Sequence, residues 1–262
     1  MNEHSNLSGV RRRKIAQLVE ERGAVAVRDL CEQFGMSEAT IRRDLRELGE
    51  KGVVTRTHGG VMINATTPRV MSDLPNEERK QVGSEEKRRI GLAAIEMLAG
   101  NEVVFLDAGT TALAVADNAH KKPGCRYVTT CLGVARRLRS QEIPSFFMIG
   151  GSYQCVNDSF AGTLAISALR SLSFDVSFLC CSAIDIARRS ISMGDEAYSQ
   201  VQREAITVSR RNIVVAHREK FTSNAFICTA GFDNIDAVIT DRGLDRDSVS
   251  RLMGAGLEVI LA

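Results

Sequence analysis

Residues 36–60 read MSEATIRRDLRELGEKGVVTRTHGG, and this stretch decides how the first part of the chain folds. It begins with residues typical of a helix start, carries three arginines within the following turns, and ends in a β-forming run and a glycine turn. A helix of this kind followed by a β-hairpin is the layout of a winged helix-turn-helix, which places one helix in the major groove of DNA. The stretch therefore predicts a DNA-binding module.

The start and the buried face of this helix follow from single residues. Ser37 is a good N-cap, because its hydroxyl accepts a hydrogen bond from a backbone N–H group that the helix start leaves unpaired. Glu38 lies in the first turn, where the helix dipole favours a negative charge. Ile41, Leu45 and Leu48 recur at i, i+4 and i+7. We expect these three side chains to form the buried face.

The opposite face carries the residues that we expect to contact DNA. At about 100° per residue, Ala39, Arg43 and Arg46 lie on that face, and Thr40 and Arg42 flank it. Arginine is suited to bidentate contacts with guanine and also binds phosphates. Because neighbouring arginines point about 100° apart, we assign Arg43 to the bases and Arg42 to the groove wall. The expected contacts of the helix, with the N-cap, are Ser37, Ala39, Thr40, Arg42, Arg43 and Arg46.

The sequence before this helix supports the motif. Apolar spacing predicts one helix over Arg11–Arg22 and a second over Val27–Phe34. Gly35 is expected to end the second helix, since glycine is common immediately after a helix. Two short helices joined by a tight turn are the remaining parts of a helix-turn-helix.

The sequence after the helix predicts the wing. Residues 53–57 are expected to form a strand, 58–60 a turn and 61–63 the returning strand. Arg56 and His58 lie where a wing would contact the DNA backbone or minor groove. A charged, solvated helix in an ordinary globular protein is the alternative interpretation. The order of helix, glycine turn, capped arginine-rich helix and hairpin favours DNA binding, and residues 1–63 are expected to form this domain.

Composition sets limits on the kind of protein. The chain has 262 residues, 44% of them hydrophobic, and a formal net charge of +2, so bulk charge does not indicate nucleic-acid binding. Its seven cysteines are an odd number with no CxxC pair, which favours reduced thiols in a cytoplasmic protein over disulfides or a metal site. No apolar stretch is long enough to span a bilayer, and the polar N-terminus is not typical of a signal peptide.

The rest of the chain predicts a second domain of the α/β class. Residues 64–84 lack an apolar period and are expected to be a linker that runs into a helix. From residue 85 to 262, short apolar runs alternate with helical patterns, which predicts a mostly parallel sheet covered on both faces. The expected strands are 103–106, 127–129, 146–149, 176–180, 213–216, 237–239 and 257–261, and the expected helices 85–98, 111–119, 133–138, 164–172, 198–210 and 247–254.

Three polar or glycine-rich loops follow successive strands of the expected sheet. In such sheets ligands bind at the carboxyl ends of the strands. The backbone N–H groups and hydroxyls of a loop such as Asp107-Ala108-Gly109-Thr110-Thr111 would suit a phosphate, while Asp107 would pair with a sugar hydroxyl or cap the helix. Each loop alone is more simply explained by turn chemistry. Together, Gly109, Thr110, Thr111, Thr129, Thr130, Gly150 and Gly151 predict a shared anion site.

The chain resembles the DeoR family of bacterial sugar-responsive transcription regulators over nearly its full length. The resemblance is carried by the block from Ser37 to Leu45, which continues to Arg56-Thr57-His58-Gly59-Gly60, and by second-domain motifs. It implies an effector domain related to ribose-5-phosphate isomerase, repression of catabolic operons and a phosphorylated sugar as effector. The second-domain motifs include Glu86-Lys87-x-x-Ile90, Leu106–Thr111, Val128-Thr129-Thr130, Gly150-Gly151, Gly162, Ile184-Asp185 and Ile239-Thr240-Asp241.

Two stretches depart from the pattern that the resemblance implies. The chain has Val128-Thr129-Thr130-Cys131 where Val-Thr-Asn-Ser is usual, and His217-Arg218-Glu219-Lys220 where Asp-x-Ser-Lys is usual. Lys220 is retained and would supply a cation for the phosphate. His217 would be a ligand donor or, more commonly for a histidine, a partly buried side chain with a local hydrogen bond. The resemblance adds Asp185 and Lys220 to the expected effector site.

The first hypothesis is therefore a repressor that binds operator DNA as a homo-oligomer, a dimer or tetramer, and responds to a phosphorylated sugar. One short helix contacts too few base pairs for useful specificity, which is why an oligomer is expected. No cofactor, metal site, catalytic residue or membrane contact is expected. A sugar-phosphate isomerase with an attached DNA module is the second hypothesis, although a shared fold does not carry an activity. The third is a second domain that only oligomerises.

Overall fold

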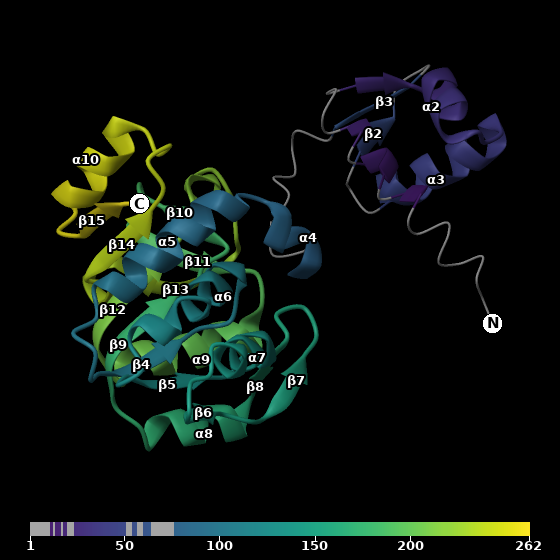
Figure 1. The fold of residues 1–262 in the computed structure, drawn as a ribbon. Coiled ribbons are helices and arrows are strands. Elements are labelled where there is room, and N and C mark those ends of the chain that lie inside the picture. The colour runs from purple at the N-terminus through teal and green to yellow at the C-terminus, as the bar shows by residue number, and fades with distance from the viewer. Residues whose placement is uncertain are drawn as a thin grey trace. The chain divides into compact units, whose positions relative to one another are not determined.

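A computed structural model describes residues 11–12, 14–16, 18–19, 24–50, 54–56, 60–63 and 76–262 of the chain. The chain divides into two compact units, Met1–Arg69 and Val70–Ala262 (Figure 1). The first unit holds the expected helix-turn-helix, and the second holds the expected α/β sheet.

The first unit is a small helical core with a three-stranded sheet. Helices α2 (Val27–Phe34) and α3 (Glu38–Glu50) are joined by a turn, and the described residues from 11 to 19 are helical. Gly35 ends α2 in the left-handed conformation that favours glycine, with φ of 62°, as the sequence predicts. Strands β1 (Ala24–Ala26), β2 (Val54–Arg56) and β3 (Gly60–Ile63) form an antiparallel sheet in the order β1-β3-β2.

One strand of this sheet was not expected from the sequence. β1 has only three residues and pairs Ala24 with Met62, so its partner lies far along the chain. The close approach of β1 and β3 requires glycine at position 60, because a Cβ there would lie 2.6 Å from the carbonyl oxygen of Val25. Gly60, which the sequence placed in the expected turn, is the first residue of the returning strand.

The second unit is built on a seven-stranded sheet in which neighbouring strands are parallel. The strand order is β15-β14-β12-β9-β4-β5-β6. Each of the seven expected strands overlaps one of these strands, so the predicted fold class is confirmed. The strands are β4 (Val103–Leu106), β5 (Arg126–Thr129), β6 (Phe146–Met148), β9 (Phe174–Leu179), β12 (Ser209–Val215), β14 (Ala237–Thr240) and β15 (Glu258–Leu261).

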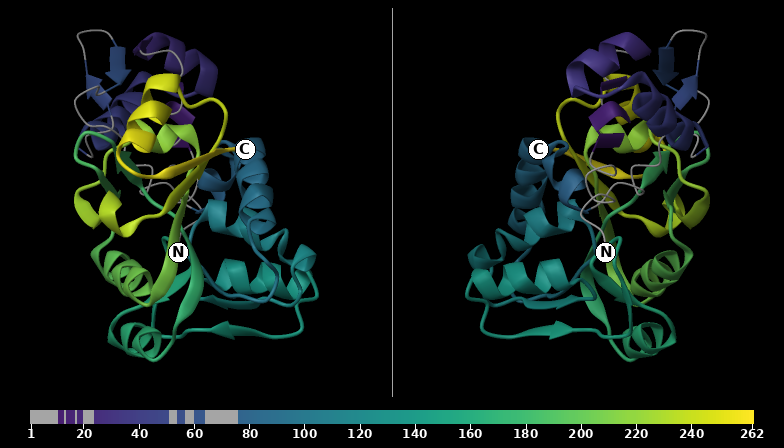
Figure 2. Two further views of the ribbon diagram at one scale, coloured as in Figure 1. Left: turned by 90° about the vertical axis from the view of Figure 1, so that its left-hand side faces the viewer. Right: turned by 90° about the vertical axis from the view of Figure 1, so that its right-hand side faces the viewer.

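Helices cover both faces of this sheet (Figure 2). Val104 and Leu106 face one apolar cluster, whereas Phe105 between them faces a second cluster and stacks on Phe174 at 5.2 Å between ring centres. This alternation is the period of two that a strand imposes on its side chains. The helices are α4 (Asn76–Gln81), α5 (Ser84–Glu96), α6 (Thr110–Ala116), α7 (Leu132–Ser140), α8 (Thr163–Arg170), α9 (Glu196–Thr207) and α10 (Arg246–Gly254).

Short antiparallel strands and single 3-10 turns complete the second unit. Strands β7 (Ser152–Gln154) and β8 (Ser159–Ala161) form a hairpin. A separate sheet has the order β10-β11-β13. The sequence did not predict these strands, because they are three to five residues long and lack a continuous apolar run. The remaining elements are β10 (Ala183–Asp185), β11 (Ser190–Met193), β13 (Ile227–Gly231), η2 (Ala119–Lys121), η3 (Arg218–Phe221) and η4 (Phe232–Asn234).

Two expected boundaries differ in the structure. The segment expected as a linker over 64–84 contains helix α4, which packs against α6 and belongs to the second unit. The helix expected over 198–210 ends at Thr207, and residues 209–215 form β12 instead. The strand begins with the polar residues Ser209-Arg210-Arg211, so a search for apolar runs did not include its start.

Candidate functional site

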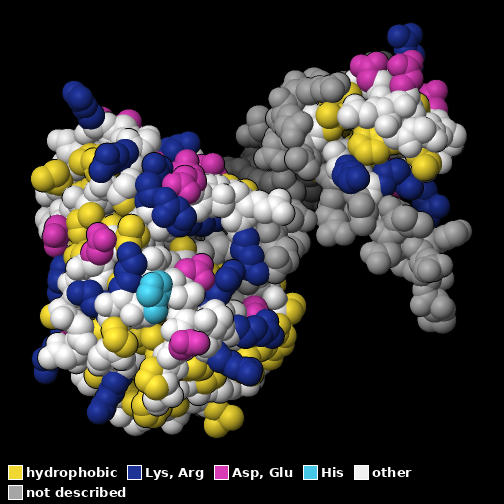
Figure 3. Space-filling model, in the orientation of Figure 1, with side chains coloured by type: hydrophobic (Ala, Val, Ile, Leu, Met, Phe, Trp, Pro, Cys, Tyr) yellow, Lys and Arg dark blue, Asp and Glu magenta, His cyan; other side chains and the backbone are white. Residues whose placement is uncertain are grey.

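Helix α3 presents one buried and one exposed face. Ile41 and Leu45 are buried in the core of the first unit together with Leu48, as the spacing predicts. Arg43 is on the other side, with a side chain that is 81% exposed. Figure 3 shows basic side chains gathered over the part of the first unit where α3 lies. The exposed residues of this face also include Ala39, Arg42 and Arg46.

The N-terminus of α3 is organised by Ser37. The Ser37 hydroxyl oxygen accepts from the backbone N–H of Thr40 at 3.4 Å and lies 2.9 Å from the Thr40 hydroxyl. Arg42 donates to the carboxylate of Glu38 one turn earlier, at 2.7 Å from Nε to Oε1. The Arg43 guanidinium makes a longer contact, 3.9 Å from Nε to Oε1 of Glu47. Arg42 is therefore held closer to its own helix than Arg43 is.

A buried ion pair joins α3 to the preceding helical segment. Asp44 is only 3% exposed, although it lies between two arginines of the exposed face in sequence. Its carboxylate accepts from Nε of Arg11 at 2.6 Å, and Nε of Arg12 lies 3.9 Å away. The acidic side chain of Asp44 is thus paired with arginine and turned inward, away from the exposed arginines of α3.

The wing is described in part. Strands β2 and β3 form the expected hairpin, with Arg56 paired to Val61. Arg56 ends β2 at the position from which a wing would reach DNA. His58, the other residue expected to make a wing contact, lies outside the described residues.

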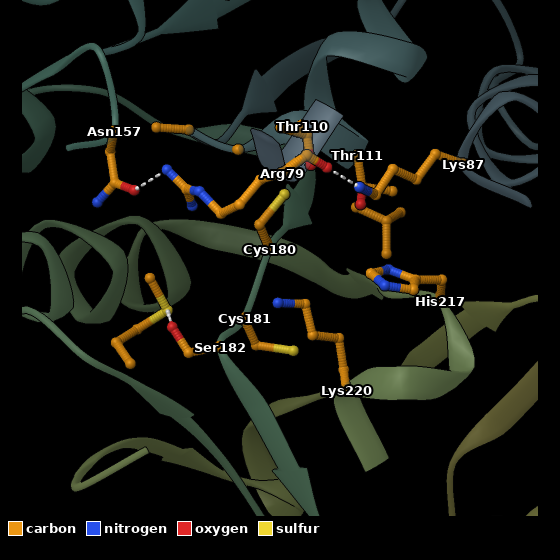
Figure 4. A pocket seen from close by; sticks show the side chains of 14 residues that line it. Arg79, Lys87, Thr110, Thr111, Asn157, Cys180, Cys181, Ser182, His217 and Lys220 are labelled. Carbon is orange, nitrogen blue, oxygen red and sulfur yellow. Dashed lines mark hydrogen bonds between the residues drawn. The ribbon is translucent and has the colours of Figure 1, made fainter. Parts of the chain in front are cut away.

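The second unit contains a pocket at the carboxyl ends of its central strands (Figure 4). The loop after β4 contributes Gly109, Thr110 and Thr111, all expected from the sequence. The segments after β9 and β12 contribute further lining residues, including Lys220. The described lining residues include no Asp or Glu: Arg79, Lys87, Ala108, Gly109, Thr110, Thr111, Asn157, Cys180, Cys181, Ser182, Met193, Val215, His217 and Lys220.

Three cationic side chains enter this pocket from different elements. Arg79 comes from α4, Lys87 from α5 and Lys220 from η3 (Figure 4). Burial, together with the nearby positive charge of Lys220, lowers the pKa of Lys87 to about 8. Burial also lowers the pKa of Lys220 and that of Arg79. An anion in the pocket would offset both the lost hydration and the mutual repulsion of these groups.

Arg79 ties α4 to the β7–β8 hairpin. Its Nη2 donates to the carbonyl oxygen of Val156 at 2.6 Å and to Oδ1 of Asn157 at 3.1 Å. Lys87 Nζ donates to the carbonyl oxygen of Arg79 at 2.5 Å. The Nε group of Arg79 is buried without a hydrogen-bond partner in the described structure. Neither Arg79 nor Lys87 was expected as a site residue, because each lies on a helix outside the loops that the sequence singled out.

Asp107 lies behind the pocket wall and neither contacts the pocket nor caps the helix. Its carboxylate accepts from Cys180 N at 2.8 Å, from Gln202 Nε2 at 2.7 Å and from the Tyr198 hydroxyl. Complete burial raises the pKa of Asp107 to about 6, although these donors favour the charged form. Asp107 therefore links β4 to the segment after β9 and to α9. It does not contact a sugar site or cap the helix, as the sequence had suggested.

Four further expected residues do not line the pocket. Thr129 and Thr130 are fully buried, and the Thr129 hydroxyl accepts from Cys131 N at 3.0 Å in the turn after β5. Gly151 allows close approach of the chain, since a Cβ there would lie 2.5 Å from the carbonyl oxygen of Ala161. Gly150 has open space beside it. These residues lie at or just after the ends of β5 and β6, the strands farthest from β12 on that side of the sheet.

Asp185 and Glu219 also lie outside the pocket lining. Asp185 ends β10, where its carboxylate accepts from Arg188 N at 2.9 Å in a separate groove. His217 does line the pocket and is 1% exposed, but it has no hydrogen-bond partner in the described structure, contrary to the local bond expected of it.

The described residues include no group of three or more His, Cys, Asp or Glu side chains that could hold a metal ion. None of the described helices has the length and apolar character needed to cross a membrane.

Both units match known domain families. Residues 11–67 match the family described as the DeoR-like helix-turn-helix domain. Residues 83–242 match the family described as the DeoR C terminal sensor domain. The chain belongs to the DeoR family of DNA-binding transcription regulators, which confirms the resemblance found in the sequence.

Curated relatives extend over most of the chain. The transcriptional repressor AccR of Agrobacterium fabrum is 35% identical, covering 89% of this chain and 89% of its own. The putative aga operon transcriptional repressor of Escherichia coli O157:H7 is 34% identical, covering 96% and 93%. The glycerol-3-phosphate regulon repressor of Escherichia coli K12 is 32% identical, covering 87% and 88%. All three are named as repressors.

A weak and partial likeness links the chain to a solved structure. Ribose 5-phosphate isomerase A from Methanocaldococcus jannaschii is 12% identical and has a TM-score of 0.40, covering 53% of this chain and 55% of its own. A likeness this weak and partial does not indicate an activity.

Replacing Tyr198 by Phe should destabilise the second unit in a pH-dependent way. Loss of a hydrogen bond to a buried carboxylate costs about 1.5–3 kcal/mol, more than loss of a bond to a neutral group. The folded-state pKa of Asp107 lies above its ordinary value, so the fold favours the protonated carboxyl group. The stability that this protonated form contributes at low pH is lost as pH rises through about 6. Without the hydrogen bond from Tyr198, the charged carboxylate of Asp107 is less stable in the folded protein. The cost measured by urea unfolding should therefore be larger at pH 8 than at pH 5.

Tyr127 offers a matched control for this measurement. Its hydroxyl is also buried, but it donates to neutral backbone carbonyl oxygens, that of Lys122 at 3.1 Å and that of Ala119 at 3.3 Å. Tyr127→Phe should cost about 1 kcal/mol, the usual value for a neutral bond. That cost should be equal at the two pH values. An equal cost for Tyr198→Phe at pH 5 and pH 8 would contradict the assigned role of Asp107.

Proposed function

We propose that this protein represses a carbohydrate catabolic operon, and that a phosphorylated sugar bound in the second unit releases it from operator DNA. One observation carries the effector part of this proposal. Arg79, Lys87 and Lys220 bring three positive charges to one pocket that has no carboxylate among its described lining residues. Buried charges of one sign are costly without a partner, and a phosphate dianion would supply that partner.

The DNA-binding part rests on the exposed face of α3. Arg43 is more exposed than Arg42 and makes the longer ion pair, so its guanidinium is freer to reach a guanine edge. Arg42 is held by Glu38 near the start of the helix, and we assign it to phosphates at the groove wall. Ser37, Thr40, Arg46, Arg56 and His58 remain proposed contacts of the same interface. We further propose a homo-oligomer, because one such helix contacts too few base pairs by itself.

The name of one relative supports a phosphorylated effector, because that relative is named for the glycerol-3-phosphate regulon. A phosphorylated small molecule fits the pocket's charge. Thr110 and Thr111 add hydroxyl donors beside the cations, and Asn157 adds an amide. These groups can bind phosphate oxygens and sugar hydroxyls at the same time.

Arg79 supplies a route from the pocket to the DNA-binding unit. It lies on α4, the first described helix after the wing strand β3 in sequence. A phosphate near its guanidinium would compete with Val156 and Asn157 for the same N–H groups. Effector occupancy would then change the position of α4. Such a change affects DNA binding only if the effector has different affinities for the two arrangements.

The alternative of a sugar-phosphate isomerase lacks an observation in its favour. Proton abstraction next to a carbonyl group needs a general base within reach of the substrate. Asp107 is covered by three donors behind the wall, and neither Asp185 nor Glu219 lines the pocket. The proposal therefore assigns the pocket to binding and not to turnover.

Replacing Arg43 by Ala should weaken specific operator binding by about 1–3 kcal/mol and relax the base preference at one position. Arg42→Ala should weaken binding to all sequences evenly and lower the salt dependence by about one phosphate contact. Fluorescence anisotropy with an operator selected from random DNA measures both. Arg210→Ala, which removes one exposed positive charge from β12 of the second unit, is the charge-matched control. A folded Arg43→Ala protein that binds its operator as tightly as the unmodified protein would contradict the placement of α3.

Anion binding by the pocket should weaken at alkaline pH. Lys87 has a pKa lowered to about 8, so it loses its charge above that pH, while a bound anion favours the charged form. Inorganic sulfate keeps a constant charge in this range, and its dissociation constant should rise about tenfold from pH 7 to pH 9. Isothermal titration calorimetry measures this change. Lys87→Met should bind sulfate more weakly at pH 7 and show a smaller rise, whereas an unchanged affinity in this variant would exclude Lys87 from the site.

A further inference from the structure

His217 is the one side chain in the described pocket whose ring nitrogens are both buried and unpaired. It follows β12 at the carboxyl end of the sheet and is 1% exposed. Glu219 Oε2 lies 3.5 Å from its Nε2, beyond hydrogen-bond distance. Buried polar groups in native proteins nearly always have a partner, so two unpaired nitrogens facing a pocket point to a ligand.

The surrounding chain holds the imidazole in place. Gly83, at the start of α5, lies against the ring, and a Cβ at that position would come 3.2 Å from Cδ2 of His217. Gly83 also has φ of 59°, a conformation that favours glycine. The ring is therefore packed between α5 and η3, and it is not free to turn toward solvent.

Burial and the surrounding positive charges keep His217 neutral. Burial, followed by the positive charges of Lys87 and Lys220, lowers the pKa of His217 to about 3. A neutral imidazole has one N–H donor and one acceptor nitrogen. It adds no charge to bind a phosphate but suits a group that both donates and accepts. The charged groups that face it are Lys87 on α5, Arg218, Glu219 and Lys220 on η3, and Asp241 after β14.

We propose that His217 is a specificity-determining residue whose ring nitrogens hydrogen-bond to hydroxyl groups on the sugar portion of the effector, the N–H donating to one hydroxyl and the other nitrogen accepting from another. This inference rests on the proposed function. Two parts of the pocket then have different roles. The phosphate is bound by Arg79, Lys87 and Lys220, and the sugar is selected by His217. A site built to hydrogen-bond a hydroxyl discriminates strongly against ligands that lack it, because its own buried groups are left unpaired.

The test compares two probes on the unmodified protein and three variants. The probes are inorganic phosphate and whichever of ribose 5-phosphate, glucose 6-phosphate, galactose 6-phosphate and fructose 6-phosphate binds the unmodified protein most tightly. His217→Leu should weaken binding of the sugar phosphate at least about tenfold, as loss of a ligand hydrogen bond does, and leave inorganic phosphate almost unaffected. His217→Gln, which keeps one donor and one acceptor, should recover part of the loss. Lys220→Met should weaken both probes.

A spectroscopic measurement separates ligand contact from a structural role. The chain has four histidines, so the imidazole signals of His217 in ¹⁵N-histidine-labelled protein can be assigned by their absence from His217→Leu. The sugar phosphate should shift both ring-nitrogen signals, and inorganic phosphate should shift them little. The thermal midpoint of His217→Leu without ligand checks that the variant is folded.

Three results would overturn the inference in distinguishable ways. Equal binding of the sugar phosphate by the unmodified protein and His217→Leu would remove the role of His217 alone. Equal losses for both probes would make His217 part of the phosphate site. Binding of inorganic phosphate, but of no sugar phosphate, by the unmodified protein would overturn both this inference and the proposed effector class.

Discussion

Three positive charges held together away from water are the constraint on which the pocket of the second unit depends. Arg79, Lys87 and Lys220 are placed there by α4, α5 and η3, and burial lowers the pKa of each. No carboxylate among the described lining residues offsets them. Asp107 is the buried acid behind this wall, but its charge is held by Tyr198, Gln202 and Cys180 N. An anionic ligand is therefore the partner that the arrangement lacks, and this is the basis for proposing an effector that carries phosphate.

The parallel sheet explains how residues far apart in sequence meet at this pocket. The strand order places β4 beside β9 and β9 beside β12, so the segments after these strands lie together at one edge. α5 then brings Lys87 over this edge, and α4 brings Arg79. The first unit uses a different arrangement for a different purpose. Its buried Asp44–Arg11 pair fixes α3 against the preceding helical segment, which leaves Arg43 exposed on the opposite face.

Much of this could be predicted from the sequence, and the failures have a common physical cause. Apolar runs located all seven main strands, and the spacing of Ile41, Leu45 and Leu48 gave the buried face of α3, because local burial leaves a local pattern. The order of the strands in the sheet, by contrast, leaves no local pattern in the sequence. Successive loops after β4, β5 and β6 were expected to share one site, yet β5 and β6 extend away from β9 and β12. Thr129, Thr130, Gly150 and Gly151 therefore lie outside the pocket lining, whereas Gly109, Thr110, Thr111 and Lys220 belong to it.

The central claim is that this pocket recognises a phosphorylated sugar, and a thermal-shift screen of the full-length protein tests it most directly. The panel consists of sugar phosphates, the corresponding free sugars and sugar acids. One phosphorylated sugar should raise the unfolding temperature, with a stabilisation of about 2.7 kcal/mol at a hundred times its dissociation constant. Its free sugar should have no effect, and Lys220→Met should abolish the response. Stabilisation by free sugars alone, or an unchanged response in Lys220→Met, would contradict the account.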